Sequence, residues 1–577
     1  MTHAPPPPAD TPAPPSTAIP AAPKPPAPTD LWSWPGWGML LPLLAIVGTV
    51  LAYLPHVCPV LFVGDSGELI TAAATGGIAH PPGYPLYTML LHAWLLLPWQ
   101  SPSTWQAALF GPAYGANCFS LACVALSVAL VTSLVWQQGR HAGWAILAGA
   151  IWAVTPTLFS QALVAEVYGL QILLVTALLA AYWRLIEIPA PGNLAIVALM
   201  QGLMLAHHPS AILWLPVTAL VVLLHAKQIR YRHNTPWLIA LAALLIGLAP
   251  FLYLPVESLK DPWLDWGNPD NWERFWAVVT RADYRAIKAH LDASEAIGIG
   301  GVLSRWASWT WHQFGVLTVP LLLGAVLAFQ KPTRWTLVLA LAWFCATVPY
   351  WWYFRTIPKT ELHYLEVYFL SSHVLLVLWG FSGLLQQATS PRPWLTGWQA
   401  GILGVIALGL IPYQWPTTVK AESRAQSQLG SRFALSTLLS IPDHSLLVCE
   451  GDEIFLYWYL QAVAGVKTDV VILEADILRD TGTWYWADLR RRQHDLAIPP
   501  TLSTRDLAKL GLTETAAIEA YQMRQLVRMN GDRRAFQTGI SFNPAKQGEI
   551  GVGYFGLLYE VPGAHADELA CGHHAGR

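Results

Sequence analysis

Two carboxylates three residues apart, Asp65 and Glu68, follow the first long apolar segment of the chain. On a helix this spacing puts both side chains on one face, where their charges interact. Interacting carboxylates at a low-dielectric edge raise each other's pKa, which suits a general base that takes a proton from a hydroxyl group. The alternative is a helix N-cap, in which Asp65 or Ser66 caps a helix that begins near Glu68. The two roles are compatible, and we predict that Asp65 and Glu68 are catalytic.

A proline-rich loop comes next, with the sequence HPPGYP from His80 to Pro85. Its prolines cannot continue a helix and lack a backbone donor, which predicts a rigid, shaped loop. His80 is suited to bond a phosphate or to orient a carboxylate, and we predict that His80 and Tyr84 bind substrate. The alternatives are a histidine satisfied by the backbone and a tyrosine at the membrane interface.

Polar residues also stand at the ends of later apolar segments. Glu166 and Tyr168 precede or begin one of them, and an acid at a helix mouth is costly unless it faces a polar cavity. His207 and His208 form the tip of a tight hairpin. Neighbouring side chains on a helix diverge by about 100°, so the two histidines do not readily share one metal ion. We expect all four residues in the substrate site, with one histidine functional and the other structural, and we predict no metal.

Two loops supply cations. The loop 257–288 combines Trp266 and Arg281 with other aromatic and basic residues, which suits a sugar face or a lipid phosphate; the alternative is an interfacial amphipathic helix with a tryptophan anchor. The loop 353–363 contains Arg355 and Lys359, which are suited to an anionic headgroup; the alternative is snorkelling at the end of a span.

The composition indicates how these residues are positioned. Of 577 residues, 54% are hydrophobic and 12% are charged, whereas soluble domains carry about 25% charged residues. Apolar runs of roughly 20 residues recur, which is typical of a polytopic α-helical membrane protein embedded in a lipid bilayer. We predict about eleven transmembrane helices, near 37–56, 108–135, 143–158, 165–186, 193–206, 209–226, 236–255, 308–328, 335–352, 364–386 and 398–415.

The basic residues of the loops predict the orientation. With a cytoplasmic N-terminus, Arg140, Arg184, Arg334 and Arg392 lie on the inside, and the short outside loops 159–164 and 207–208 contain no Lys or Arg. This assignment treats 85–98 as a short helix at the membrane surface; a true span there would invert every later orientation. All the candidate site residues then face the non-cytoplasmic side.

The two ends of the chain differ from its middle. Residues 1–30 are rich in Pro and Ala and predict a disordered tail, and residues 31–416 form the membrane domain. Residues 417–577 predict a soluble, non-cytoplasmic α/β domain with strands at 445–449 and 470–473 and a helix at 454–463. The acidic stretch 449–453 follows a strand, and an acidic strand end of this kind often binds a ligand; we favour the alternative, a surface loop with a charge bias at the start of that helix.

Whole classes of function lack support in the sequence. No P-loop or GxSxG pattern occurs, and a GxGxxG run by itself, such as GVGYFG at 551–556, is a weak signal. We therefore expect no cofactor and no hydrolase chemistry. The net charge of −2 gives no hint of a nucleic-acid partner.

The motifs resemble a known family. GDSGELITAAATGGIAHPPGYPLY at 64–87 is similar to bacterial membrane proteins of a domain of unknown function, which are related to a eukaryotic endoplasmic-reticulum protein O-mannosyltransferase. The resemblance continues through AEVYGLQ at 165–171, GLMLAHHPS at 202–210 and the segment 252–275, and covers most of residues 36–390. Both groups are similar to the GT-C glycosyltransferase superfamily. The sequence departs from the family at one motif. Where the resemblance implies Arg-Phe-x-Leu-Pro near the tenth span, residues 368–372 read YFLSS. The phosphate-contacting arginine of that motif is therefore missing, and Arg355 or Lys359 is the substitute that we expect.

The resemblance implies a GT-C-like fold, a polyprenyl-phosphate sugar donor, inversion at the sugar, and an acid of the first external loop as base, at the position of Asp65. We therefore expect a glycosyltransferase of the bacterial inner membrane that transfers a sugar to a protein or glycan acceptor. The alternatives are a lipid or solute transporter and a non-catalytic assembly scaffold. A transporter predicts internal repeats and helices interrupted at mid-membrane, whereas the polar motifs here gather at one face.

Overall fold

The computed structural model describes residues 36–103, 106–229, 234–282, 296–356, 365–388, 397–449 and 451–474, together with short stretches between 489 and 538 and residues 558–561. The predicted tail 1–30 and Lys359 lie outside the described residues.

The described part of the chain is mostly helical. By length and composition, eight of its helical segments are able to cross a membrane. They comprise α1 (Trp37–Tyr53) with η2 (Leu54–His56), α4 (Gly111–Gly139), α7 (Val167–Glu187), η3 (Pro209–Trp214) with α9 (Leu215–Ile229), α10 (Thr235–Leu248) with η4 (Ala249–Leu252) and α11 (Tyr253–Ser258), α14 (Gly298–Phe314) with η6 (Gly315–Leu317), α15 (Thr318–Leu327) and η7 (Ala328–Gln330), α16 (Arg334–Phe354), and η9 (Glu366–Phe369) with α17 (Leu370–Ala388). This supports a polytopic helical protein.

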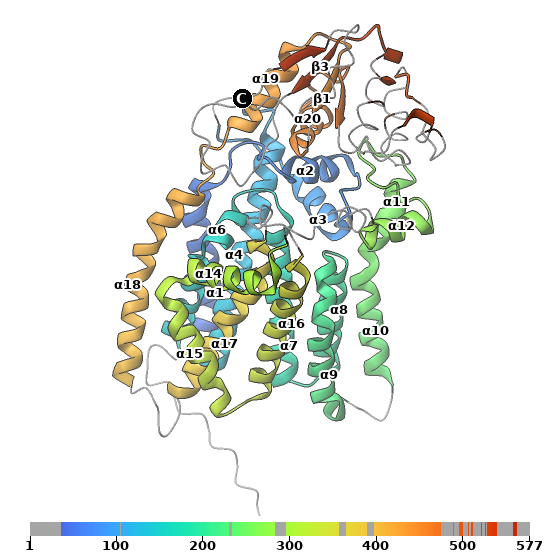
Figure 1. Cartoon of the computed structure of the whole chain (residues 1–577). Helices are drawn as coiled ribbons and strands as arrows, with labels where there is room; N and C mark the ends of the chain where they lie inside the picture. Colours follow the sequence, from blue (N-terminus) through green and yellow to red (C-terminus); the bar gives the residue numbers. More distant parts are fainter. Residues whose placement is uncertain are drawn as a thin grey trace, which may run out of the picture.

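The other three predicted spans also coincide with helices but are less regular. Helices α5 (Ala142–Ala153) and α6 (Pro156–Ala162) are bent by 70° at the break between them, where Pro156 cannot donate a backbone hydrogen bond. Helix α8 (Pro191–Leu205) is shorter than a usual span, with 15 residues, and α18 (Gly397–Glu422) runs along one side of the bundle (Figure 1). The exact number of spans therefore stays a prediction.

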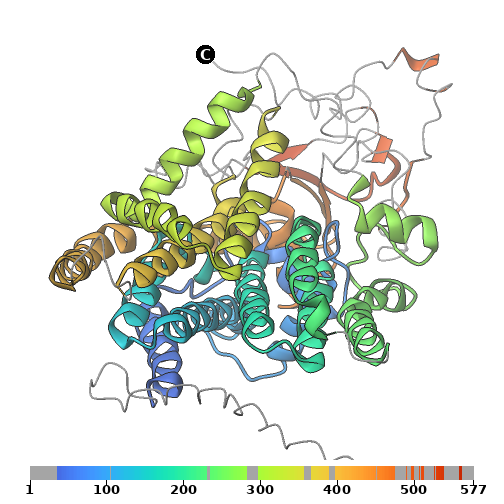
Figure 2. The ribbon, with the colours of Figure 1, turned by 90° about the horizontal axis from the view of Figure 1, so that it is seen from below.

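Three short helices and the C-terminal strands gather at one end of the bundle, which we call the site end (Figure 1). The helices are α2 (Ser66–Thr75), α3 (Pro85–Leu95) and α12 (Trp272–Val279). Seen from below, most of the long helices appear nearly end-on (Figure 2). Loops that are far apart in the sequence therefore meet at the site end.

The C-terminal part contains α19 (Leu429–Ser440), β1 (Leu446–Cys449), α20 (Glu453–Ala462), β2 (Val471–Glu474), β3 (Ala535–Thr538) and β4 (Leu558–Val561). The strand order is β2-β1-β3-β4, with β1 parallel to both β2 and β3, and β4 antiparallel to β3. The bounds of β1, α20 and β2 differ by about one residue from those of the strand, helix and strand expected from the sequence. The unbroken apolar runs of the two strands are typical of a parallel sheet that is covered on both faces.

Packing is continuous between this part and the membrane helices. Buried residues of α2, α4, α19, α20 and β1 belong to one hydrophobic cluster. The hydroxyl of Ser431 donates to the Leu61 carbonyl at 2.6 Å, and that of Tyr459 donates to the Leu109 carbonyl at 2.7 Å. These bonds fasten α19 and α20 to the loops of the site end. A domain boundary near residue 417 stays a prediction, since the core does not break there.

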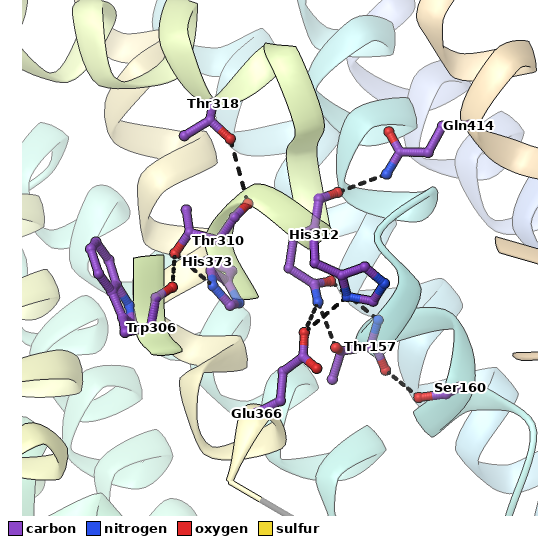
Figure 3. Close-up of polar contacts among 10 residues, drawn as sticks. Thr157, Ser160, Trp306, Thr310, His312, Thr318, Glu366, His373 and Gln414 are labelled. Atoms are coloured by element: carbon purple, nitrogen blue, oxygen red, sulfur yellow. Dashed lines mark hydrogen bonds and ion pairs between the residues drawn. The ribbon is translucent and has the colours of Figure 1, made fainter. Parts of the chain in front are cut away.

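A polar network ties α14 to three other elements (Figure 3). The side-chain amide of Gln313 donates to Glu366 of η9 and, at 2.6 Å, to the Thr157 hydroxyl of α6. The Gln313 carbonyl accepts from Gln414 of α18 at 2.9 Å, and the His312 ring lies 3.3 Å from Glu366. Buried polar groups that are paired in this way fix one arrangement of the elements, and the network holds η9 in place at the start of α17.

Candidate active site

Asp65 stands at the N-cap position of α2, but its side chain makes no capping hydrogen bond. The hydroxyl of Ser66, the other candidate cap, donates instead to the Ala165 carbonyl at 2.8 Å. The Asp65 side chain is 42% exposed. It is therefore accessible, and the capping alternative does not describe it.

Glu68 lies behind His80. It accepts from the His80 backbone N–H at 2.5 Å and lies 2.6 Å from the ring Nδ1, and its side chain is fully buried. The other ring nitrogen, Nε2, lies 3.8 Å from the Asp65 carboxylate. The three side chains thus form a row, Glu68–His80–Asp65, in which only Asp65 is open.

The charges of this row depend on one another. Burial by itself lowers the pKa of His80, but the Glu68 and Asp65 carboxylates more than offset it and raise that pKa to about 9. Burial raises the pKa of Glu68, and His80 opposes that rise. His80 is therefore predominantly protonated at neutral pH, which compensates the carboxylates beside it.

The same three residues offer metal-ligand atoms within 4.8 Å of one another. The spacing of the sequence did not suggest this grouping, because the loop returns His80 to α2 from twelve residues away. Glu68 orients the ring through Nδ1 and leaves Nε2 directed at Asp65, and we interpret the row as an acid–histidine–acid relay. The expectation of no metal stays a prediction.

Trp266 reaches His80 through a backbone pairing between two distant loops. The N–H of Ile78 donates to the Leu264 carbonyl at 2.8 Å, and the N–H of Trp266 donates to the Ile78 carbonyl at 3.2 Å. The Trp266 ring then lies 6.0 Å from the His80 ring. Arg281, farther along the same loop, interacts electrostatically with His80 and His208. Trp266 thus lies next to His80, and the roles predicted for Trp266 and Arg281 stay predictions.

The two interpretations of that loop concern different residues. Helix α12 has one exposed aromatic face, with Trp272 at 74% and Trp276 at 43% exposure, as expected for an interfacial amphipathic helix. Trp266 precedes the helix and Arg281 follows it; the Trp266 ring lies beside His80, and the charge of Arg281 acts on His80 and His208.

Tyr84 connects the proline loop to the histidine hairpin. Its buried ring lies 5.2 Å from the His80 ring and is stacked on the His208 ring at 6.0 Å. His208 also contacts the Tyr168 ring at 6.5 Å, whereas His207 packs against Tyr87 at 6.3 Å. His208 thus faces the aromatic wall of the site.

Both histidine side chains are buried, and burial determines their protonation. Nε2 of His207 lies 3.1 Å from the Val167 carbonyl, and burial lowers the pKa of His207 to about 4. Burial also lowers the pKa of His208 to about 3, helped by the positive charges of His207 and Arg281. Both rings are neutral at pH 7. The His208 ring also accepts from the Ser210 N–H at 3.2 Å, so both histidines have a structural partner, and the predicted division into one functional and one structural histidine stays a prediction.

Two further acids adjoin the row. Burial raises the pKa of Glu166, and the charges of Asp65 and Asp452 add to the rise. Burial also raises the pKa of Asp452 to about 7, helped by Asp65 and Glu68. Asp452 comes from the acidic stretch 449–453, for which the sequence favoured a surface loop over a binding role. Its position directly after a buried strand was the signal for the binding role.

The second cationic loop is less closely connected. The Arg355 guanidinium lies 3.6 Å from the centroid of its own neighbour Trp352 and donates to the Trp352 carbonyl. Among the contacts of the described residues, none joins Arg355 to the Asp65 row. The choice between phosphate binding and snorkelling for Arg355 stays a prediction, and the cation whose charge acts on His80 is Arg281. The expected role of Lys359 is not addressed by the described structure.

The comparisons with known proteins agree with the motifs. Residues 65–231 match the family model of the protein O-mannosyl-transferase TMEM260 N-terminal domain. The resemblance to this family is confirmed. The protein O-mannosyl-transferase TMEM260 of Mus musculus is 33% identical over 230 residues, which is 38% of this chain and 31% of the mouse protein. The Dictyostelium discoideum relative of the same name is 21% identical over 494 residues, 77% of this chain and 58% of that protein. The chain thus spans less than two thirds of either relative.

Solved structures with a similar arrangement are more distant. ArnT from Cupriavidus metallidurans, bound to undecaprenyl phosphate, covers 81% of this chain with 96% of its own, at 12% identity and a TM-score of 0.49. The S. cerevisiae Pmt1-Pmt2 complex bound to its sugar donor covers 39% of this chain with 33% of its own, at 16% identity and a TM-score of 0.31. Both TM-scores lie below 0.5, so the relatives in sequence are the more informative comparison.

Proposed function

We propose that this protein is a membrane glycosyltransferase that moves a sugar from a polyprenyl-phosphate donor to an acceptor hydroxyl, with Asp65 as the general base. The observation that carries the proposal is the row Glu68–His80–Asp65, in which an open, uncapped carboxylate is backed by a buried histidine–glutamate pair. All three residues of this row lie within residues 65–231, the part of the chain that matches the protein O-mannosyl-transferase family model.

In the proposed reaction the acceptor oxygen attacks the anomeric carbon of the donor sugar. The carbon–oxygen bond to the phosphate breaks, and the lipid phosphate leaves with its electron pair. The acceptor proton passes to the Asp65 carboxylate, and attack from the side opposite the phosphate inverts the anomeric centre. Since a phosphate leaves as an anion, no acid is required to protonate it, which fits a site with one open carboxylate.

Glu68 and His80 have supporting roles in this scheme. A buried glutamate that bonds both the backbone and the ring of His80 fixes the direction of the ring. The protonated ring then stands beside Asp65 and stabilises its ionised form. Glu68, predicted from the sequence as catalytic, thus acts through His80, because it is buried away from any substrate.

Arg281 is the proposed contact for the donor phosphate. It interacts electrostatically with His80 and His208, and guanidinium groups bond phosphate oxygens strongly and with defined geometry. Tyr84, Tyr168, His208 and Trp266 are suited to form the walls of the sugar site, since aromatic faces pack against sugar rings.

The Arg281→Gln variant should bind polyprenyl phosphate about 10–100-fold more weakly, because a charge-assisted bond to phosphate contributes roughly 1.5–3 kcal/mol. Equilibrium binding to the purified protein in detergent measures this. Arg274→Gln is the matched control, since Arg274 lies on α12 of the same loop, is half exposed and pairs with Asp270 at 3.1 Å. Equal affinities of the two variants would remove Arg281 from the phosphate site.

The proposed orientation puts the site end on the non-cytoplasmic side of a bacterial inner membrane. Added protease should then cut the C-terminal part, residues 420–577, in intact spheroplasts. Cleavage that occurs only after lysis would contradict both the orientation and the face of the reaction.

The proposal is tested by incubating the purified full-length protein with a panel of polyprenyl-phosphate sugars and an acceptor polypeptide. The names of the relatives make a mannose donor and serine or threonine hydroxyls the first choice. Release of polyprenyl phosphate together with glycosylated polypeptide is expected. A protein that binds these lipids but releases no polyprenyl phosphate with any sugar would favour the transporter or scaffold alternative.

A further inference from the structure

Helix α20 of the C-terminal part forms one wall of the site. A Cβ added at Gly67 in the first turn of α2 would lie 2.3 Å from the Phe455 carbonyl oxygen, so the two backbones touch and only glycine fits. Gly67 follows Asp65 by two residues, and Phe455 follows Asp452 by three. The contact therefore brings the starts of both helices, with an aspartate at each, to the same place.

Trp266 connects this wall to His80. Its ring lies 6.0 Å from His80 on one side, and 6.2 Å and 6.1 Å from Phe455 and Trp458 of α20 on the other. The relay, the tryptophan and the first turns of α20 thus form a contiguous group of contacts.

The turn that presents Asp452 is held in place. The N–H of Gly451 donates to the Glu474 carboxylate at 2.8 Å, and Gly451 has a φ of +60°, which favours glycine. The next residue, Glu453, accepts from the Tyr457 hydroxyl at 2.5 Å and from the Thr538 hydroxyl at 3.0 Å. Glu453 is therefore occupied within the fold of the C-terminal part.

Asp452 differs from its neighbour. None of the residues that the structure describes is seen to donate a hydrogen bond to its carboxylate, although the side chain is partly buried. Its charge interacts instead with Asp65, His80 and Glu68, and with Glu166. Because this carboxylate is only half-buried, it is open to a donor from outside the fold, and the substrates of a glycosyltransferase supply hydroxyl donors.

We propose that Asp452 is a substrate-contacting residue of this site, supplied by the C-terminal part, and that its carboxylate accepts a hydrogen bond from a hydroxyl group of the transferred sugar or of the acceptor. This inference rests on the proposed function and adds a residue from outside the segment 65–231. It also gives the C-terminal part a direct share in substrate selection, because an extra carboxylate beside Asp65 disfavours anionic sugars and acceptors.

The test compares Asp452→Asn with wild type in the full-length protein, with kcat and KM measured separately for donor and acceptor. Loss of one charge-assisted bond should raise one KM about tenfold. A rise in the donor KM assigns the bond to the sugar, and a rise in the acceptor KM assigns it to the acceptor. The midpoint of thermal unfolding should stay unchanged, because no described residue of the fold bonds the carboxylate.

Asp443→Asn is the matched control, since Asp443 lies in the same part of the chain and its side chain is 75% exposed. Unaltered KM values in Asp452→Asn, or equal changes in both variants, would overturn the inference and leave the proposed function standing. Wild-type protein that transfers no sugar from any donor would instead overturn the proposed function, and this inference with it.

Discussion

Replacing Asp65 with Asn is expected to slow sugar transfer by about 10²–10⁴-fold, the usual effect of losing a general base. Asn has nearly the size of Asp but does not accept the acceptor proton at neutral pH. The Asp65 side chain makes no capping bond and is 42% exposed, so the folded protein should be preserved. Transfer is measured with the purified variant under saturating donor and acceptor, next to its unfolding midpoint.

Asp443→Asn serves as the control here as well. It removes a carboxylate that is 75% exposed and lies far along the chain from the row. The ion pair of so exposed an acid contributes little to stability. Donor binding by Asp65→Asn should stay close to that of wild type, because the lost proton transfer belongs to the chemical step. A folded Asp65→Asn protein that transfers sugar at the wild-type rate would refute the assignment of Asp65 as base.

The Glu68→Ala variant should lose roughly 3–5 kcal/mol of unfolding free energy, because it leaves the buried His80 ring and backbone N–H without their acceptor. Both partners of the pair are buried, with Glu68 at 0% and His80 at 7% exposure. Activity should fall too, since the ring that stands beside Asp65 loses its orientation. Chemical or thermal unfolding of the detergent-solubilised protein measures the first effect.

Two further variants separate the pair from a general loss of charge. Glu68→Gln keeps an oxygen acceptor for the His80 N–H and should be less destabilised than Glu68→Ala. Glu257→Ala removes an acid that pairs with the 61% exposed Lys260, and such surface pairs contribute at most about 1 kcal/mol. Similar unfolding free energies for Glu68→Ala and Glu257→Ala would contradict the buried pair.

Local patterns of the sequence determine much of this molecule. Apolar runs of spanning length predict the helices, because a bilayer requires every backbone group to be bonded within its own segment. The prolines and glycine between His80 and Pro85 predict the break between α2 and α3, and the apolar runs at 445–449 and 470–473 predict β1 and β2. Asp65 and His80 are recognisable as candidates because polar groups beside an apolar segment are costly without a function.

Distances between segments are decided only by the tertiary structure. Whether Glu68 faces substrate or supports His80 depends on how the proline loop folds back on α2. The Ser66 hydroxyl does not cap α2 because it bonds the carbonyl of Ala165, 99 residues away. Asp452 lies at the site because Gly67 allows α20 to touch α2, a contact between residues nearly 400 positions apart. Hydrophobic periodicity records which face of a helix is buried, but not which partner covers it. The sequence by itself therefore determines the elements and the chemical types, whereas the pairing of Glu68 with His80 and the contact of α20 with α2 follow from packing alone.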